Sequence, residues 1–95
     1  MHIFEWDDAK AESNQRKHGV AFLIAMTVFD DPFSIGFIDP LSAEHGEERF
    51  VIVGMGGAEL LAVTYTDRGE SVRLISARRA TRKEHDDYYR ENSGS

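Results

Sequence analysis

Apolar and polar residues change their spacing near the middle of the chain, which separates a helical region from an extended one. Between residues 21 and 30, apolar side chains are three and four positions apart, as on one face of an α-helix. Between residues 33 and 38 the spacing changes to every second position, as in a strand. Pro32 separates the two regions, because the residue before a proline is disfavoured in a helix. The predicted helical stripe consists of Phe22, Ala25, Met26 and Phe29.

Capping residues and further alternation predict the remaining elements. Asp7 and Gly19 bracket a predicted helix over residues 8–18, as its N-cap and as a C-terminal glycine with positive φ. Thr81 and Glu84 have the spacing of a capping box, which predicts a last helix that ends near residue 91. Strands are predicted over residues 3–6, 33–38, 49–54, 60–66 and 71–79.

This order of elements, β-α-α-β-β-β-β-α, predicts an α+β fold. Short connections between successive strands require antiparallel pairing. The four later strands should therefore form an antiparallel four-stranded sheet, joined by the short N-terminal strand and packed with three helices. At 95 residues the chain is long enough for one small domain. We place this domain at residues 1–91, followed by a flexible tail at residues 92–95.

Composition excludes several kinds of site. The chain has no cysteine, which excludes disulfides, thiolate zinc sites and a cysteine nucleophile. Its four histidines lack the i, i+4 spacing of a helical metal site, so we expect no metal. No apolar run approaches the roughly 18 residues of a membrane span, and the N-terminus does not have the pattern of a signal peptide. We therefore expect a cytoplasmic protein without a membrane partner.

Charge is distributed unevenly along the chain. The formal net charge is −6, yet residues 68–83 carry six basic side chains and one acidic one, against four basic and twelve acidic in residues 1–67. The six cations either form ordinary surface ion pairs or bind a phosphate-bearing partner such as a nucleic acid. They are Arg68, Arg73, Arg78, Arg79, Arg82 and Lys83.

Alternation along residues 71–79 predicts which of these arginines lie together. If Val72 and Leu74 face the helices, Arg73 and Arg79 share the open face of the sheet and Arg78 lies at its rim.

An arginine-rich sheet suits the chemistry of metal-free RNA cleavage. The 2′-hydroxyl of the substrate is the nucleophile, and the protein supplies an acid, a base and cations around the phosphate. Each candidate for proton transfer also has a structural interpretation, such as a helix cap or a core edge. These candidates are Glu84, His85, His18, Tyr65 and Tyr88.

A series of short motifs resembles the BrnT family of type II toxins over almost the whole chain, from about residue 3 to residue 89. The resemblance implies a RelE-like fold and RNA cleavage that arrests translation without a metal or cofactor. It also implies a BrnA-type antitoxin partner, and contact with operator DNA only through that antitoxin. The motifs are Phe4-Glu5-Trp6-Asp7, Lys17-His18-Gly19-Val20, Val28-Phe29-Asp30-Asp31-Pro32, Glu47-Glu48-Arg49-Phe50, and Ile75-Ser76-Ala77-Arg78-Arg79-Ala80-Thr81 followed by Glu84 and Tyr88.

The resemblance and the strand pattern together give the candidate site. By resemblance, Arg78 in the Ser-Ala-Arg motif, Arg49 in the Glu-Arg-Phe motif and Glu84 after the arginine-rich turn are the expected catalytic residues. The expected RNA-binding residues, which rest on strand periodicity and on the cluster of cations, are Arg73, Arg79, Arg82 and Lys83. The alternative is a non-enzymatic binding module of the same fold, whose basic strand holds an acidic partner or a nucleic acid.

Leu23 and Ile24 lie beside the apolar stripe of the predicted helix at residues 21–30. Either this chain covers them or a partner does. Similar sequences often carry polar residues here, which favours a partner surface. We therefore expect an interface with an antitoxin or with a second copy, as in a homodimer within a toxin–antitoxin complex.

Overall fold

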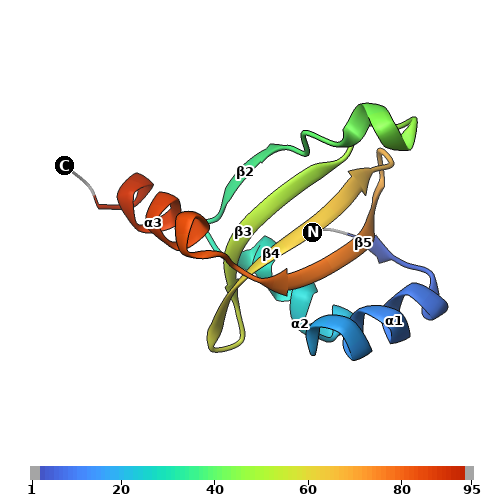
Figure 1. Ribbon diagram of the computed structural model, residues 1–95, viewed down its shortest axis with the longest axis horizontal. Coiled ribbons are helices and arrows are strands. Elements are labelled where there is room, and N and C mark those ends of the chain that lie inside the picture. The colour runs from blue at the N-terminus through green and yellow to red at the C-terminus, as the bar shows by residue number, and fades with distance from the viewer. Residues whose placement is uncertain (1–2, 94–95) are drawn as a thin grey trace.

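The computed structural model describes residues 3–93, which form an α+β fold around a five-stranded sheet (Figure 1). The strand order is β1-β5-β4-β3-β2, with β1 parallel to β5 and all other neighbours antiparallel. The predicted order of elements and the antiparallel pairing of the four later strands are confirmed. The elements are β1 (Ile3–Glu5), α1 (Asp8–His18), α2 (Phe22–Ala25), β2 (Ile35–Ile38), β3 (Phe50–Gly56), β4 (Glu59–Asp67), β5 (Ser71–Arg79) and α3 (Arg82–Glu91), with the 3₁₀ helices η1 (Met26–Asp30) and η2 (Ser42–His45).

The predicted helix caps are confirmed. Asp7 accepts a hydrogen bond from the Ala9 N–H at the start of α1 (2.8 Å), and Gly19 ends this helix with φ of 68°. Thr81 and Glu84 form both hydrogen bonds of the capping box at the start of α3. Local sequence therefore determines where these two helices begin.

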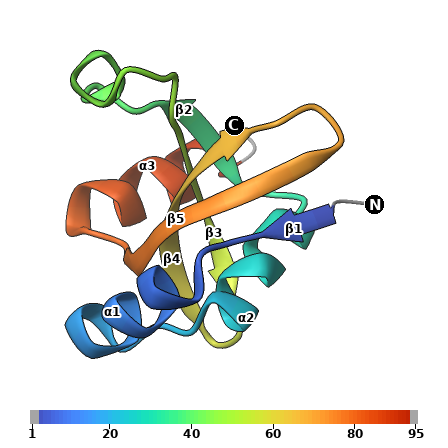
Figure 2. The same ribbon diagram turned by 90° about the vertical axis from the view of Figure 1, so that its right-hand side faces the viewer.

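The sheet separates two hydrophobic clusters. α1 and α2 cover one face, where Leu61, Val63 and Leu74 are buried. On the other face, Tyr88 of α3 packs against a smaller cluster that includes Val53. Figure 2 shows α3 and α1 on opposite sides of β5. Among the described helices, only α3 joins the second cluster, so α3 covers one end of this face. We call this second face the open face; it carries Val51, Thr64, Ser76 and Arg78.

The prediction of one continuous helix over residues 21–30 is wrong, because the segment changes from α2 to the 3₁₀ helix η1 after Ala25. The tighter winding brings residues three positions apart into line, and the buried residues are accordingly Phe22, Ala25 and Val28. η1 packs closely on β3. A Cβ added at Gly56 would lie 3.1 Å from Val28 Cγ2 of η1 and 3.2 Å from the Ile24 carbonyl oxygen of α2, so glycine allows this close approach.

β5 contains a bulge opposite β4. Thr64 pairs with Ser76, but the next residue, Tyr65, pairs with Leu74. Ile75 is therefore an additional residue without a partner in β4, as in a β-bulge. Because of this extra residue, side chains before and after Ile75 do not follow one continuous alternation between the two faces of the sheet.

The bulge changes which arginines lie together. Leu74 and Ala77 are both buried against α1 and α2, and Arg73 and Arg78 consequently both lie on the open face. Arg79 lies on the helical face, where its Nη1 donates to the carbonyl oxygen of His18 (3.1 Å). The prediction that Arg73 and Arg79 share the open face is wrong, because it assumed unbroken alternation.

Asn14 of α1 fixes β5 just after the bulge. Its amide oxygen accepts the Ala77 N–H (3.0 Å), and its amide nitrogen donates to the carbonyl oxygens of Ala77 and Val20 (both 2.9 Å). β1 pairs only with residues 71–73 of β5. The Asn14 side chain therefore takes the place of a neighbouring strand at Ala77.

Asp31 connects η1 to β3 and to α3. One carboxylate oxygen accepts both the Met55 N–H (2.8 Å) and the Tyr88 hydroxyl (2.7 Å), and the other accepts the Phe33 N–H (2.8 Å). The turn at Phe33 explains why β2 begins at Ile35 and not at residue 33. Burial alone would raise the pKa of Asp31, but these hydrogen bonds outweigh burial and lower it.

Two expectations concern regions outside the core. Within residues 3–93, no helix is long and apolar enough to cross a membrane. Of the predicted tail at residues 92–95, residues 94 and 95 lie outside the described part of the chain. Asn92 donates to the Phe33 carbonyl oxygen (2.9 Å).

Asn14→Ala should lower the free energy of unfolding by about 2–4 kcal/mol, because it leaves buried backbone groups of Ala77 and Val20 without partners. Urea unfolding followed by circular dichroism measures this change. Gln15→Ala, at an exposed neighbouring position, is the control and should change stability by less than about 0.5 kcal/mol. Equal effects of the two substitutions would contradict the role given to Asn14.

The lowered pKa of Asp31 predicts a loss of stability in acid. A carboxyl group whose pKa is lower in the folded state stabilises the fold above its unfolded pKa of about 4. That stabilisation disappears as the pH falls through the folded pKa. Asp31→Asn should therefore flatten the dependence of unfolding free energy on pH below about pH 5. Asp30→Asn, at the exposed adjacent residue, should leave the dependence steep.

Candidate functional site

Arg78 and Glu84 form an ion pair where the open face meets α3. The two guanidinium Nη atoms donate to the two carboxylate oxygens, at 2.7 and 3.0 Å. The Glu84 side chain is only 13% exposed, whereas that of Arg78 is 39% exposed. Arg78 therefore presents part of its guanidinium to solvent while Glu84 holds it from behind.

Both partners of this pair are strongly ionised. The hydrogen bond with Glu84 raises the pKa of Arg78. Burial alone would raise the pKa of Glu84, but hydrogen bonds from Arg78 and Thr81 outweigh it and lower this pKa. One Glu84 oxygen also accepts the Thr81 N–H (2.8 Å). The Glu84 carboxylate is thus committed to Arg78 and to the helix cap.

Three more arginines lie at the opposite end of the open face. Arg73 contacts Glu5 across the β5–β1 pair (3.7 Å). Arg49 and Arg68 share one carboxylate, that of Glu47, at 3.8 and 3.9 Å. This end therefore has three cations for two acidic partners, and its ion pairs are longer than the pair between Arg78 and Glu84.

Arg49 is the least satisfied of these cations. Its side chain is 16% exposed, and its Nε is buried without a hydrogen-bond partner. A buried unpaired N–H group of a cation is costly unless an acceptor reaches it. The Nη2 of Arg49 is 3.8 Å from the nearest Glu47 oxygen, which is longer than a hydrogen bond, so the end of the guanidinium is suited to an anionic acceptor on the open face.

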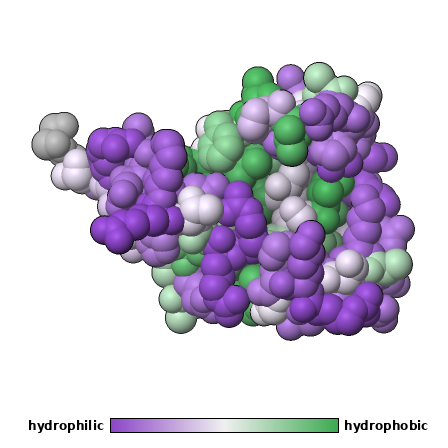
Figure 3. Space-filling view, in the orientation of Figure 1, coloured by the Kyte–Doolittle hydropathy of each residue, from purple (hydrophilic) through white to green (hydrophobic). Residues whose placement is uncertain are grey.

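Hydroxyl groups lie between the two ends of the face. Thr64 and Ser76 are opposite each other on β4 and β5, and the pairing continues to Val51 on β3. From the Arg78 row to the Arg73 row, β4 advances four residues, or about 13 Å. Figure 3 shows apolar surface over the sheet bordered by hydrophilic surface on α3 and at the opposite end. The arginines at both ends, with these hydroxyls between them, form a track across the open face.

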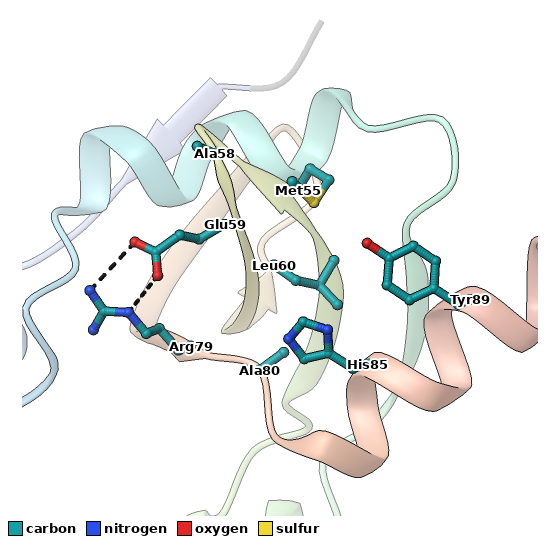
Figure 4. Close-up of a pocket in the computed structure, with 8 residues that line it drawn as sticks. All are labelled: Met55, Ala58, Glu59, Leu60, Arg79, Ala80, His85 and Tyr89. Atoms are coloured by element: carbon teal, nitrogen blue, oxygen red, sulfur yellow. Dashed lines mark hydrogen bonds and ion pairs between the residues drawn. The ribbon is translucent and has the colours of Figure 1, made fainter.

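Three of the predicted RNA-binding residues lie away from this track. Arg79 forms an ion pair with Glu59 (2.5 Å) beside a hollow of about 330 Å³ on the other flank of α3 (Figure 4). Arg82 and Lys83 lie in the first turn of α3 and are exposed. Lys83 contacts Asp87 (2.8 Å). Of the four predicted RNA-binding residues, only Arg73 lies on the open face with Arg49 and Arg78.

Of the candidates for proton transfer, only Glu84 contacts an arginine of the open face. Tyr65 packs on the opposite face, against the ring of Phe29 (5.0 Å between centroids), and burial raises its pKa. Tyr88 donates to Asp31, and burial, with Asp31, raises the pKa of Tyr88 to about 12. His85 lines the hollow of Figure 4, and His18 ends α1.

Leu23 and Ile24 are exposed by 67% and 44%, so the described chain does not cover them. They lie in α2, on the side of the sheet opposite the open face. Their assignment to an interface stays a prediction.

Arg68, Glu5 and Glu47 are residues of the site that the sequence analysis did not select. Arg68 follows β4 in a turn, and its Nε donates to Thr66 (3.4 Å). Nothing in the spacing of these residues links them, because Glu47 precedes β3 and Glu5 belongs to β1. The run of six cations contained Arg68, and two of the motifs contained Glu5 and Glu47, but neither signal indicated that these residues lie together.

Within residues 3–93, no group of three or more His, Asp or Glu side chains is arranged so that it could hold a metal ion. The site is built from arginines, carboxylates that hold them, and hydroxyls.

Comparison with protein families assigns this chain to a known family. A search of curated proteins finds no match for the chain. A family model described as the ribonuclease toxin BrnT of type II toxin–antitoxin systems matches residues 6–84. The match spans α1, the whole antiparallel part of the sheet, and the start of α3 up to Glu84. This chain therefore belongs to the BrnT family of ribonuclease toxins of type II toxin–antitoxin systems.

Proposed function

We propose that this protein is a metal-independent endoribonuclease whose active site is the open face of the sheet. The main support is the shared placement of Arg49, Arg73 and Arg78 on that face, with Arg49 incompletely paired. Because the bulge in β5 brings Arg73 and Arg78 to one side, a single RNA strand can contact both ends of the face. Membership of a ribonuclease family supports the same reaction class.

In the proposed reaction, the 2′-hydroxyl of the RNA attacks the adjacent phosphorus. The bond from O2′ to phosphorus forms and the bond from phosphorus to O5′ breaks. This leaves a 2′,3′-cyclic phosphate and a 5′-hydroxyl, and the proton lost by O2′ is balanced by the one gained by O5′. Charge accumulates on the phosphate oxygens in the transition state, and a preorganised arginine stabilises it. Arg78 is the arginine that we assign to this phosphate.

Glu84 acts as a positioning residue in this proposal. Its two oxygens hold the two terminal nitrogens of Arg78, so the guanidinium reaches the substrate in one orientation. Its lowered pKa makes Glu84 a weak base near neutral pH. Proton transfer by Glu84 itself, expected from the sequence, stays a prediction that a conservative substitution tests.

Arg49 and Arg73 bind flanking phosphates in this proposal. The terminal nitrogen of Arg49 has only a 3.8 Å contact with Glu47, and a phosphate oxygen would supply a closer acceptor. Arg73 is partly neutralised by Glu5 (3.7 Å), which leaves room for a second anionic partner. The two arginines would hold the RNA strand while Arg78 acts on the bond that is cut.

Family membership implies an antitoxin partner, and we propose that it is of the BrnA type and acts in the cytoplasm. Contact with operator DNA would be made by that antitoxin and not by this chain. We propose that the exposed pair Leu23 and Ile24 contributes to assembly with the antitoxin or a second copy. A RelE-like classification of the fold is consistent with a sheet that is flanked by helices and left open at one end.

The purified protein should cleave single-stranded RNA in the presence of EDTA and leave 2′,3′-cyclic phosphate ends. Arg78→Ala should lower the cleavage rate by about 10²–10³-fold, the typical effect of removing one preorganised donor. Gel electrophoresis of end-labelled RNA and analysis of the product ends measure both. Arg16→Ala, at an exposed position of α1, is the matched control and should cleave at the wild-type rate.

A folded wild-type protein that leaves RNA intact in EDTA would refute metal-independent cleavage and favour a non-enzymatic binding module. Glu84→Gln preserves the capping box but removes the charge that holds Arg78. It should lower the rate at every pH without moving the pH optimum. A shifted pH profile would instead assign proton transfer to Glu84.

The salt dependence of RNA affinity should come from phosphate contacts with the arginines of the open face. Each phosphate contact contributes about 0.7 to the slope of log affinity against log salt for single strands. Replacing Arg49 and Arg73 by Ala should therefore flatten the slope by about 1–1.5 units. Fluorescence anisotropy with a non-cleavable RNA measures the slope. Replacing Arg16 and Lys17, two exposed cations of α1, should not change it, and equal flattening would place the RNA elsewhere.

A further inference from the structure

Phe37 is an exposed aromatic residue at the margin of the open face. It lies on β2 opposite Val51 of β3, and the same row continues through Thr64 and Ser76. Side chains paired across antiparallel strands lie on the same face. The Phe37 ring is therefore on the face of Arg78, and the residue is 43% exposed.

Exposure of this ring calls for an explanation, because β2 is an edge strand. Edge strands with exposed apolar side chains favour aggregation, and folded proteins generally avoid them. The neighbouring Ile35, on the same face, is instead packed against the cluster around Tyr88. Of the two β2 residues on this face, Phe37 is therefore the one that the described chain leaves exposed.

Phe37 and Ile35 form the apolar part of a hollow between β2 and α3. The hollow has a volume of about 570 Å³ and is lined by Ile35, Gly36, Phe37, Lys83, Asp87, Arg90 and Glu91. This volume is in the range of sites that bind small organic groups. Asp87 pairs with both Lys83 and Arg90, and Glu91 adds a further acidic group.

The charges around the hollow favour a nucleobase over a phosphate as its ligand. Two cations and two carboxylates line it, so their charges balance and a phosphate gains little there. The lysine and arginine provide hydrogen-bond donors, and the carboxylates provide acceptors. A hollow lined by an aromatic side chain and by donors and acceptors whose charges balance is suited to a nucleobase.

We propose that Phe37 is the stacking platform of a nucleobase subsite for the RNA substrate, in the hollow between β2 and α3. This inference rests on the proposed ribonuclease function of the open face. Phe37 and Ser76 are three strands apart, or about 14 Å. The base bound at Phe37 therefore belongs to a nucleotide that flanks the cleaved one, while its phosphates continue along the arginines.

The test uses a short single-stranded RNA with 2′-O-methyl groups, which cannot be cleaved, and with 2-aminopurine in place of each base in turn. Stacking on an aromatic ring quenches 2-aminopurine fluorescence. The wild-type protein should quench one position strongly. Phe37→Ala and Phe37→Leu should abolish this quenching and weaken affinity by about tenfold to a hundredfold, whereas Phe37→Trp should retain both.

Ile38→Ala is the matched control, because Ile38 is exposed on the same strand but lies on the opposite face. It should leave quenching and affinity unchanged. Phe37→Leu preserves apolar bulk, so a loss of quenching with an unchanged circular dichroism spectrum identifies stacking and not folding. With cleavable RNA, Phe37→Leu should raise KM and leave kcat near the wild-type value.

The outcomes separate the subsite from the function on which it rests. If the wild-type protein cleaves RNA and Phe37→Leu binds and quenches as the wild type does, the subsite is refuted and the ribonuclease function stands. If Phe37→Leu impairs antitoxin binding alone, Phe37 belongs to a protein interface and the subsite is again refuted. If the wild-type protein neither binds nor cleaves RNA, both proposals fail.

Discussion

The arrangement of arginines on the open face depends on the hydrogen bonds made by the side-chain amide of Asn14. It bonds both backbone groups of Ala77, immediately after the bulge at Ile75, and so fixes the register of the last part of β5. With this register, Ala77 is buried and Arg78 faces the open side. A slip of one residue would exchange the two faces and turn Arg78 toward the core. The Asn14 side chain, which takes the place of a strand partner at Ala77, therefore determines that Arg78 lies on the open face.

The local elements could be predicted from the sequence, since each depends on neighbouring residues. Asp7, Gly19 and the capping box of α3 determine helix ends within one turn. The helix over residues 21–30 was predicted incorrectly because its winding is set by a distant contact. η1 packs against β3 at Gly56, where a larger residue would crowd Val28. No residue within 21–30 specifies this contact.

Most residues of the candidate site were predicted from motifs, and strand periodicity added Arg73. Arg78, Arg49 and Glu84 came from resemblance, and the structure places Arg78 and Glu84 in direct contact. The grouping of Arg73 with Arg79 depended on alternation, which a single bulged residue reverses. A bulge is the response of one strand to the register of another, so the spacing within residues 71–79 does not contain it.

The partner of Asn14 is 63 positions later in the chain, and β1 likewise pairs with the last strand. During synthesis, α1 leaves the ribosome long before β5 exists, and the Arg78–Glu84 pair requires the start of α3. Contacts of such large sequence separation form late, because loop closure must precede them. The arginines of the open face therefore come together only when nearly the whole chain has been made. A chain that stops before residue 84 lacks the carboxylate that holds Arg78.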